Sequence, residues 1–278
     1  MRTATSSSIK RIRALSRGLA VLRALEQGGS QTLHQLAGRT ALAKATLLRI
    51  LATLEDDSYV RRGLGDQLYH LNMRRAPPPS EGWKAVLAEV AGAVLDRLCH
   101  EVVWPSDIGI YEEGAIRIQE TSRRITPILV SRDVLAKDIH VLQSAMGRAF
   151  LAWCAESRKC EVLERLSASK HPFDRLARDR QAVEEMLATV KVKGYATRHR
   201  GYFVTQPRES RVSAIAVPIF VGDVPVGAVN LVWVATAMPE ADFAREYAPR
   251  LDAAADEIST AVTERLRGLG ESWKEELA

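Results

Sequence analysis

Apolar residues in the first quarter of the chain recur at helical spacing. In "KATLLRILATL" (44–54), leucine or isoleucine occupies positions 47, 50, 51 and 54, which share one side of a helix. Runs at roughly 15–27 and 32–38 have the same periodicity, and Ser30 or Thr32 can cap the second. Two strand-like runs then flank a Gly-Leu-Gly-Asp turn. Three helices and a hairpin in about 75 residues predict a winged helix-turn-helix.

A proline run at 77–79 ends this pattern, because consecutive prolines continue neither a helix nor a sheet ladder. We expect a domain at 1–76, a linker helix at 77–100 and a second domain at 101–278. The apolar stripe of the linker helix belongs either to the core or to a helix–helix dimer seam. Strands interrupted by helices and then resumed predict an α+β domain with a mostly antiparallel sheet. The expected strands are 102–111, 115–120, 125–131, 195–205, 212–221 and 224–235, and the expected helices are 144–154, 157–167, 178–193 and 240–267.

Charge is distributed unevenly along the chain. Residues 1–76 contain 13 basic and 5 acidic residues, whereas the remainder contains 26 basic and 29 acidic ones. A basic module on a slightly acidic body indicates a polyanionic partner, and the second helix of a helix-turn-helix enters the major groove of double-stranded DNA. For each arginine taken alone, a solvated side chain is the alternative. The predicted DNA-contacting residues are Arg17, Lys44, Ala45, Thr46, Arg49, Arg61 and Arg62.

Several classes of protein are not indicated by the sequence. No apolar run reaches the roughly 18 residues of a membrane span, and the N-terminus lacks the pattern of a secretory signal. The three cysteines are widely spaced and form no C-x-x-C, as expected for reduced thiols in a cytoplasmic protein. No catalytic, nucleotide-binding or zinc-binding motif occurs. We therefore expect a protein that is not an enzyme and uses neither a metal nor a cofactor.

Five segments carry a resemblance to a known family: "SRGLAVLRALEQGG", "TLHQLAGRTALAKATLLRILATLEDDSYVRR", "LQSAMGRAFLAW", "KGYATRHRGYF" and "VSAIAVPIF". On these segments the chain resembles IclR-type bacterial transcriptional regulators along nearly its whole length. Thr46-Leu47-Leu48-Arg49 departs mildly from the Thr-Val-x-Arg phrase usual in that family. The segments "LCHEVVWPSDIGIY", "HRGYF" and "GAVNLVWVATAM" are most similar to activators of 3-(3-hydroxyphenyl)propionate catabolism.

The resemblance implies a GAF-like effector-binding domain that takes an organic acid at the turn "QSAMG". Ser144 is a natural N-cap, and Ala145, Met146 and Gly147 are expected to place three free N–H groups on the first turn, where such groups bind carboxylates. On this view Gly147→Glu would abolish the effector response without preventing folding. Asn230, if buried, either holds backbone or binds an effector oxygen, and for Trp104 and Trp233 plain core packing is the alternative. The predicted effector-binding residues are Trp104, Ile108, Ile110, Val130, Ser144, Ala145, Met146, Gly147, Tyr202, Asn230 and Trp233.

These observations predict a DNA-binding regulator controlled by a small carboxylic acid. The many large apolar candidates favour an aromatic acid over glyoxylate or pyruvate. The expected partners are a pseudo-palindromic DNA operator, a second copy of the chain (or a dimer of dimers), and RNA polymerase at the promoter. One alternative is a C-terminal domain that only oligomerises, and another is a response to a small aliphatic keto acid.

Overall fold

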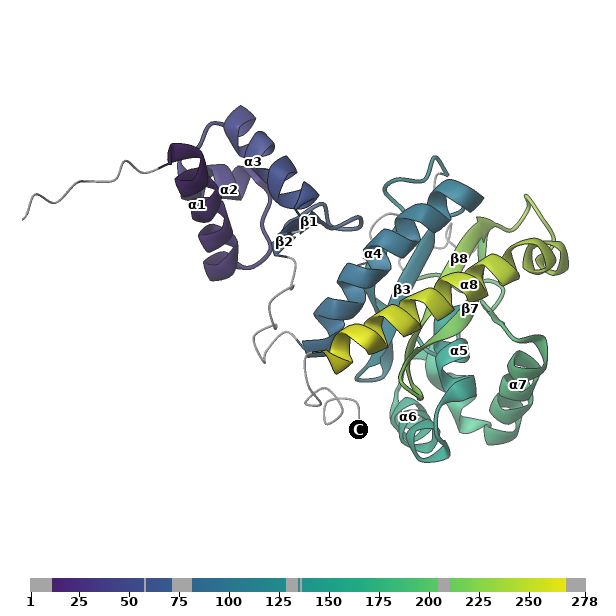
Figure 1. The fold of residues 1–278 in the computed structure, drawn as a ribbon. Helices are drawn as coiled ribbons and strands as arrows, with labels where there is room; N and C mark the ends of the chain where they lie inside the picture. Colours follow the sequence, from purple (N-terminus) through teal and green to yellow (C-terminus); the bar gives the residue numbers. More distant parts are fainter. Residues whose placement is uncertain are drawn as a thin grey trace, which may run out of the picture. The chain divides into compact units, whose positions relative to one another are not determined.

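The computed structural model describes residues 12–57, 59–71, 82–128, 135, 137–204 and 211–268 (Figure 1). The chain forms two compact units, Met1–Arg75 and Ala76–Ala278. Each unit has its own hydrophobic core.

The N-terminal unit has three helices and a two-stranded antiparallel sheet, as the apolar spacing predicts. Leu47 and Leu51 of the third helix are fully buried, and Ile50 and Leu54 pack against the same core. The predicted apolar stripe of this helix is therefore confirmed. The elements are α1 (Arg13–Gly28), α2 (Leu33–Thr40), α3 (Lys44–Asp56), β1 (Val60–Arg62) and β2 (Tyr69–Leu71).

Helix α2 begins with a capping box. The Thr32 hydroxyl accepts a hydrogen bond from the backbone N–H of Gln35 at 3.2 Å, and the Gln35 side chain accepts one from the backbone N–H of Thr32 at 2.8 Å. Two N–H groups that the helix leaves without partners are thereby satisfied. Of the two predicted caps, Thr32 is the one used. The short connection to α3 turns through Ala41, which has a left-handed conformation with a φ of 53°.

The C-terminal unit is built on one six-stranded antiparallel sheet in the order β5-β4-β3-β8-β7-β6. A winged helix-turn-helix followed by an α+β domain confirms the predicted fold class. The strands are β3 (Ser106–Glu112), β4 (Ala115–Thr121), β5 (Asp138–His140), β6 (Ala196–Thr197), β7 (Val212–Val221) and β8 (Val224–Val234). The helices are α4 (Gly82–Val102), α5 (Ala145–Trp153), α6 (Glu156–Ala168), the 3-10 helix η1 (Pro172–Arg178), α7 (Arg180–Lys193) and α8 (Glu240–Arg267).

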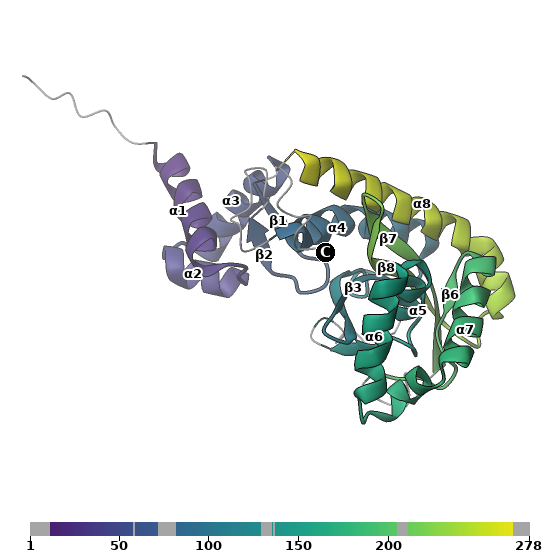
Figure 2. The same ribbon diagram turned by 90° about the horizontal axis from the view of Figure 1, so that it is seen from below.

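Helices cover both faces of this sheet (Figure 2). Helices α4 and α8 lie side by side on one face, and α5 packs on the other. The sheet curls around α5, since the Tyr202 hydroxyl, which follows β6, accepts a hydrogen bond from the backbone N–H of His140 in β5 at 3.0 Å. The N-terminal end of α5 therefore lies where the two edges of the sheet approach each other.

The apolar stripe of α4 belongs to the core of its own unit. Trp83, Val86, Leu87 and Leu95 are buried, and Arg265 of α8 forms an ion pair with Glu89 of α4 at 2.9 Å. Of the two readings of this stripe, core or dimer seam, the core is the one observed.

Three strand predictions need correction. Helix α4 continues to Val102, so β3 begins only at Ser106. Residues 125–128 form turns and bends, and residues 129–131 of that prediction lie outside the described part. The strand predicted at 195–205 is only Ala196–Thr197. Apolar runs of this length cannot be assigned to helix, strand or buried turn from periodicity alone.

Candidate functional site

The surface of α3 opposite its apolar stripe carries the polar residues predicted to face DNA. Lys44, Ala45 and Arg49 are exposed, and Thr46 is half-buried. The first turn of α3 contains no acidic residue. Its N-cap residue is Ala43, which has no side-chain oxygen that could accept a hydrogen bond from the helix. A helix N-terminus of this kind presents open N–H groups and a partial positive charge, which suit a phosphate.

The hairpin beside α3 is held in place by polar contacts. The Ser30 hydroxyl lies 2.7 Å from Nδ1 of His70, whose Nε2 lies 3.0 Å from the Asp66 carboxylate. Burial raises the pKa of the Asp66 carboxyl, but the hydrogen bonds from His70 and from the backbone N–H of Leu68 outweigh it, so the pKa lies below its usual value. Gln31 and Tyr69 add a backbone bridge.

The predicted cations of the N-terminal unit lie on three different elements. Arg61 is half-buried and Arg62 exposed, both on β1. The Arg62 guanidinium lies 5.5 Å from the centre of the Tyr69 ring, and its Nε donates to the Gln67 carbonyl at 3.3 Å. Arg17 is exposed on α1.

The turn before α5 has the form expected of an anion site, with one difference. Ser144 caps the helix by accepting a hydrogen bond from the backbone N–H of Gly147 at 3.0 Å. The Gly147 amide is therefore occupied, which corrects the prediction that three amides are free. Among the described residues, none accepts a hydrogen bond from the amides of Ala145 and Met146. Within the described part of the chain, two donors of the first turn therefore have no hydrogen-bond partner, and both belong to buried residues.

Gly147 is required here by close packing. A Cβ atom at this position would overlap the backbone carbonyl of Val141. The expectation that Gly147→Glu would leave folding intact is therefore wrong, because any side chain displaces that backbone.

A buried arginine that the sequence analysis missed fixes the same turn. Arg148 donates to the carbonyl oxygens of Leu142 at 2.8 Å and Thr197 at 3.0 Å. Burial lowers its pKa to about 10, so it remains cationic at neutral pH. A buried positive charge bonded to the segment that leads into the turn favours an anion in this region.

Aromatic side chains pack against the segment that leads into the turn. His140 lies 5.1 Å from Phe173 and 5.8 Å from Tyr202, measured between ring centres. Phe173 and Tyr202 lie 5.2 Å apart, edge to face. Tyr202 was predicted as an effector-binding residue, whereas His140 and Phe173 were not, although "HRGYF" and "HPF" mark two of these segments.

Asn230 lies on the face of the sheet toward α5, and its side chain is hydrogen-bonded to the backbone of the neighbouring strand β3. Its Oδ1 accepts a hydrogen bond from the backbone N–H of Asp107 at 2.8 Å. Asp107 also forms a buried, two-bond ion pair with Arg123, both distances being 2.7 Å. Burial raises the pKa of this carboxyl, but the charge and hydrogen bonds of Arg123 bring it below its usual value. Of the two roles considered for Asn230, the structure shows the backbone role.

Four predicted effector residues point away from the turn of α5. Trp233 stacks on Phe243 of α8, with ring centres 3.9 Å apart, and Trp104 meets Phe243 edge-on at 5.7 Å. Side chains alternate along a strand, so Trp233 and Asn230 face opposite sides of the sheet. Ile108 pairs with Val229, which lies on the same face of the sheet as Trp233. Ile110 is two residues further along β3 and therefore points to that face as well. The prediction that Trp104, Ile108, Ile110 and Trp233 surround the turn is wrong, and Val130 lies outside the described residues.

The described part of the chain shows no group of three His, Cys, Asp or Glu side chains that could hold a metal ion. None of the helices described is both long enough and apolar enough to cross a membrane.

Comparison with known proteins agrees with this architecture. Residues 14–63 match the IclR helix-turn-helix domain, and residues 84–260 match the bacterial transcriptional regulator IclR C-terminal domain. The chain therefore belongs to the IclR family of DNA-binding transcriptional regulators.

Solved structures of IclR-type regulators share the fold. One from Brucella abortus is 20% identical, with 92% of this chain and 95% of that chain covered and a TM-score of 0.52. One from Alicyclobacillus acidocaldarius is also 20% identical, with 91% and 100% covered and a TM-score of 0.52. The IclR of Thermotoga maritima is 18% identical, with 91% and 100% covered and a TM-score of 0.50.

Proposed function

We propose that this IclR-family regulator binds an aromatic carboxylic acid at the first turn of α5 and controls an operon for the catabolism of an aromatic compound. The observation that carries the proposal is the pair of open amides at Ala145 and Met146 beside the buried Arg148. A carboxylate at this turn would gain two N–H donors, the helix dipole and a nearby cation.

The aromatic part of the proposal rests on the cluster of His140, Phe173 and Tyr202. We assign to these rings the role first predicted for Trp104, Ile108, Ile110 and Trp233, which face the other side of the sheet. The rings belong to the segments that meet at the turn, and they have flat apolar surfaces. The similarity of three segments to activators of 3-(3-hydroxyphenyl)propionate catabolism supports the same class of effector and favours activation, which would involve contact with RNA polymerase.

For DNA recognition we propose a homodimer, or a dimer of dimers, that binds a pseudo-palindromic operator. The N-terminal residues of α3 would lie in the major groove, and the arginines of β1 would contact phosphate or the minor groove. The uncapped, acid-free start of α3 supports this orientation.

The DNA part is tested with Arg49→Ala in the full chain. We expect operator affinity to fall by about 1–3 kcal/mol and sequence preference to relax at one position, as for a base contact. Fluorescence anisotropy with operator and mutated operator duplexes measures both quantities. Arg180→Ala, an exposed arginine of α7, is the matched control. Unchanged affinity and preference would remove Arg49 from the interface.

The effector part is tested by thermal shift of the full chain against glyoxylate, pyruvate, 4-hydroxybenzoate, protocatechuate, phenylacetate and hydroxylated phenylpropionates. An acid present at about 100 times its dissociation constant adds about 2.7 kcal/mol of stability. We expect an aromatic acid to give the largest shift. A shift with glyoxylate or pyruvate alone would assign a keto acid instead, and no shift at all would favour a domain that only oligomerises.

The position of this site is tested with Ala145→Asp. Ala145 is buried, but a carboxylate on the first turn can accept hydrogen bonds from the two amides itself, so we expect the ligand shift to be lost. Ala145→Asn adds the same bulk without the charge and is the control for packing at this position. Ala241→Asp makes the same change in the exposed first turn of α8 and should keep the shift. If the shift survives Ala145→Asp, the acid binds elsewhere.

A further inference from the structure

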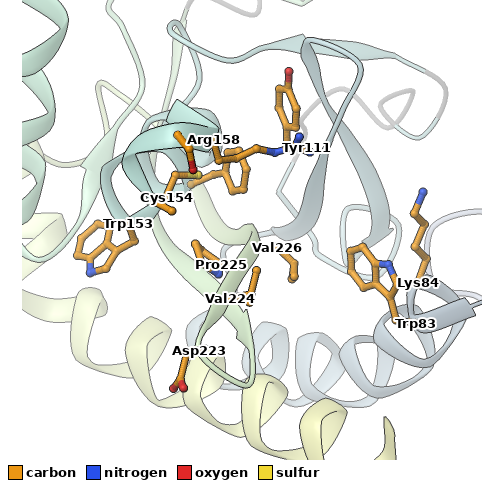
Figure 3. Close-up of a pocket in the computed structure, with 13 residues that line it drawn as sticks. Trp83, Lys84, Tyr111, Trp153, Cys154, Arg158, Asp223, Val224, Pro225 and Val226 are labelled. Carbon is orange, nitrogen blue, oxygen red and sulfur yellow. The ribbon is translucent and has the colours of Figure 1, made fainter. Parts of the chain in front are cut away.

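A cleft of about 590 Å³ opens at the C-terminal end of α5, away from the turn at Ser144 (Figure 3). Its walls come from the start of α4, the end of β3, the junction of α5 with α6, and the hairpin between β7 and β8. This volume lies within the range of small-molecule sites, roughly 300–1,000 Å³. All of its lining residues belong to the C-terminal unit.

Four aromatic side chains from three elements line the cleft. Trp83 and Phe150 are buried, and Tyr111 and Trp153 are half-buried. The rings of Tyr111 and Phe150 stack with centres 5.2 Å apart and planes 9° from parallel. Val226 adds an aliphatic surface on the hairpin. Walls of this kind favour a flat aromatic body, which can lie against ring faces without ordering many side chains.

Cationic side chains stand on two sides of these rings (Figure 3). Lys84 is held by an ion pair with Glu112. Arg158 forms an ion pair with Glu161 at 2.7 Å, and its guanidinium lies 5.3 Å from the centre of the Tyr111 ring. Asp223 contributes an acidic side chain on the hairpin, away from Arg158 in Figure 3. Each of these ion pairs uses only part of the N–H donors of its cation, so the remaining donors of Lys84 and Arg158 can bind a negative group carried on a flat ring system.

We infer that this cleft is a second small-molecule site, for a flat aromatic anion, and that it is distinct from the effector turn of α5. A ligand here contacts Trp83 and Lys84 in the first turn of α4. That helix is the first element of the C-terminal unit after the segment that joins it to the DNA-binding unit. Binding at the cleft therefore stabilises the start of α4 whether or not the effector turn is occupied.

The first test is isothermal titration of the full chain with 2-naphthoate, a bicyclic aromatic carboxylate. We expect saturable binding that weakens by about two- to fivefold for each charge removed in Lys84→Gln and Arg158→Gln, as for exposed ion pairs. Arg245→Gln removes an exposed arginine of α8 that is also ion-paired and should leave binding unchanged. The neutral 2-naphthamide should bind more weakly than 2-naphthoate and should not respond to the charge variants.

A second variant tests the cleft by filling it. Ala155 is exposed on the lining of the cleft at the start of α6, so Ala155→Trp can occupy the space without entering the core. We expect at least a tenfold loss of 2-naphthoate affinity with an unchanged circular dichroism spectrum. Ala145→Asp, at the other end of α5, should leave this affinity intact.

Three results would overturn the inference. The first is an absence of saturable binding to the wild-type chain. The second is equal affinity in wild type, the charge variants and Ala155→Trp. The third is loss of binding in Ala145→Asp alone, which would place the 2-naphthoate at the effector turn. Light scattering interprets the first of these results, because dissociation of an oligomer by Ala155→Trp in a chain that does not bind 2-naphthoate would show the cleft to be an interface between copies.

Discussion

At the scale of single residues, the turn before α5 depends on two residues of very different kinds. Ser144 was predicted from its residue type, because a hydroxyl before an apolar helix is a frequent N-cap. Gly147 was predicted as an effector-binding residue, whereas the constraint that the structure shows is the Val141 carbonyl against which it packs. Such a contact joins two segments, so it is visible only once both are placed.

Buried charge at this scale was the hardest feature to predict. Asp107, Arg123 and Arg148 read as ordinary surface residues in the sequence, yet each is at least nine-tenths buried. A charge can be buried only where partners converge on it, and those partners come from distant parts of the chain. The polar network around Asn230 therefore could not be predicted from spacing.

His140 should make stability depend on pH. Burial lowers the pKa of its imidazole, and the charge of His171 lowers it further, against the opposing effect of Asp174 and Asp138. The unfolded state then binds a proton that the folded state does not, below the unfolded pKa of about 6.5. The contribution of neutral His140 to the free energy of unfolding is fully present above this pH. It declines as the pH falls toward the folded pKa, by at most about 1.4 kcal/mol per pH unit.

Urea unfolding of the full chain between pH 5 and 8 measures this effect. His140→Gln should have a shallower decline below pH 6.5 than the wild type, while being less stable at pH 8 because it loses a contact with the Tyr202 hydroxyl. His199→Gln, an exposed histidine of the same unit, should keep the wild-type slope. Identical slopes in wild type and His140→Gln would contradict the prediction.

At the scale of elements, helices were predicted better than strands. Helix α3 has one buried face and one exposed face, so the spacing of its leucines alone defines both. Strands β3 and β8 are buried on both faces, because α4 and α8 cover one side and α5 the other. Their apolar runs therefore give no sign of which residues face the effector turn.

The capping box of α2 should contribute measurably to the N-terminal unit. Thr32→Ala removes the acceptor for the Gln35 amide, which costs about 1 kcal/mol. In a unit of this size that lowers the unfolding midpoint by roughly 4–8 °C. Circular dichroism melting of the full chain should show the change in the transition of the N-terminal unit, with Gln27→Ala on α1 as control. A midpoint equal to that of the control would show that the box contributes nothing.

At the scale of the whole molecule, the excess of basic residues in 1–76 defines which unit meets a polyanion. The exposed cations of α3 and β1 belong to this excess. Neutralising phosphates releases counterions, so operator affinity should fall steeply with salt. If six to ten phosphates are neutralised by a dimer, affinity drops by about 10³–10⁵ between 50 and 200 mM salt.

The double variant Arg61→Gln, Arg62→Gln tests this expectation. In the proposed dimer each substitution removes two charges, and each lost phosphate contact reduces the slope of log affinity against log salt by about 0.9. Anisotropy titrations at four or five salt concentrations give the slope, and Arg245→Gln in the C-terminal unit should not change it. An unchanged slope in the double variant would remove the hairpin from the DNA interface.

The sequence by itself determined what depends on local periodicity and residue type. The helices of the DNA-binding unit, its charge and the capped turn "QSAMG" all lie within short stretches, where spacing along the chain equals spacing on a helix. Only the tertiary structure decided which face of β3 and β8 meets α5, why Gly147 has no side chain, and which rings gather around His140. Those features arise where segments far apart in the chain converge, and the packing of both sheet faces erases the alternation that would otherwise have revealed them.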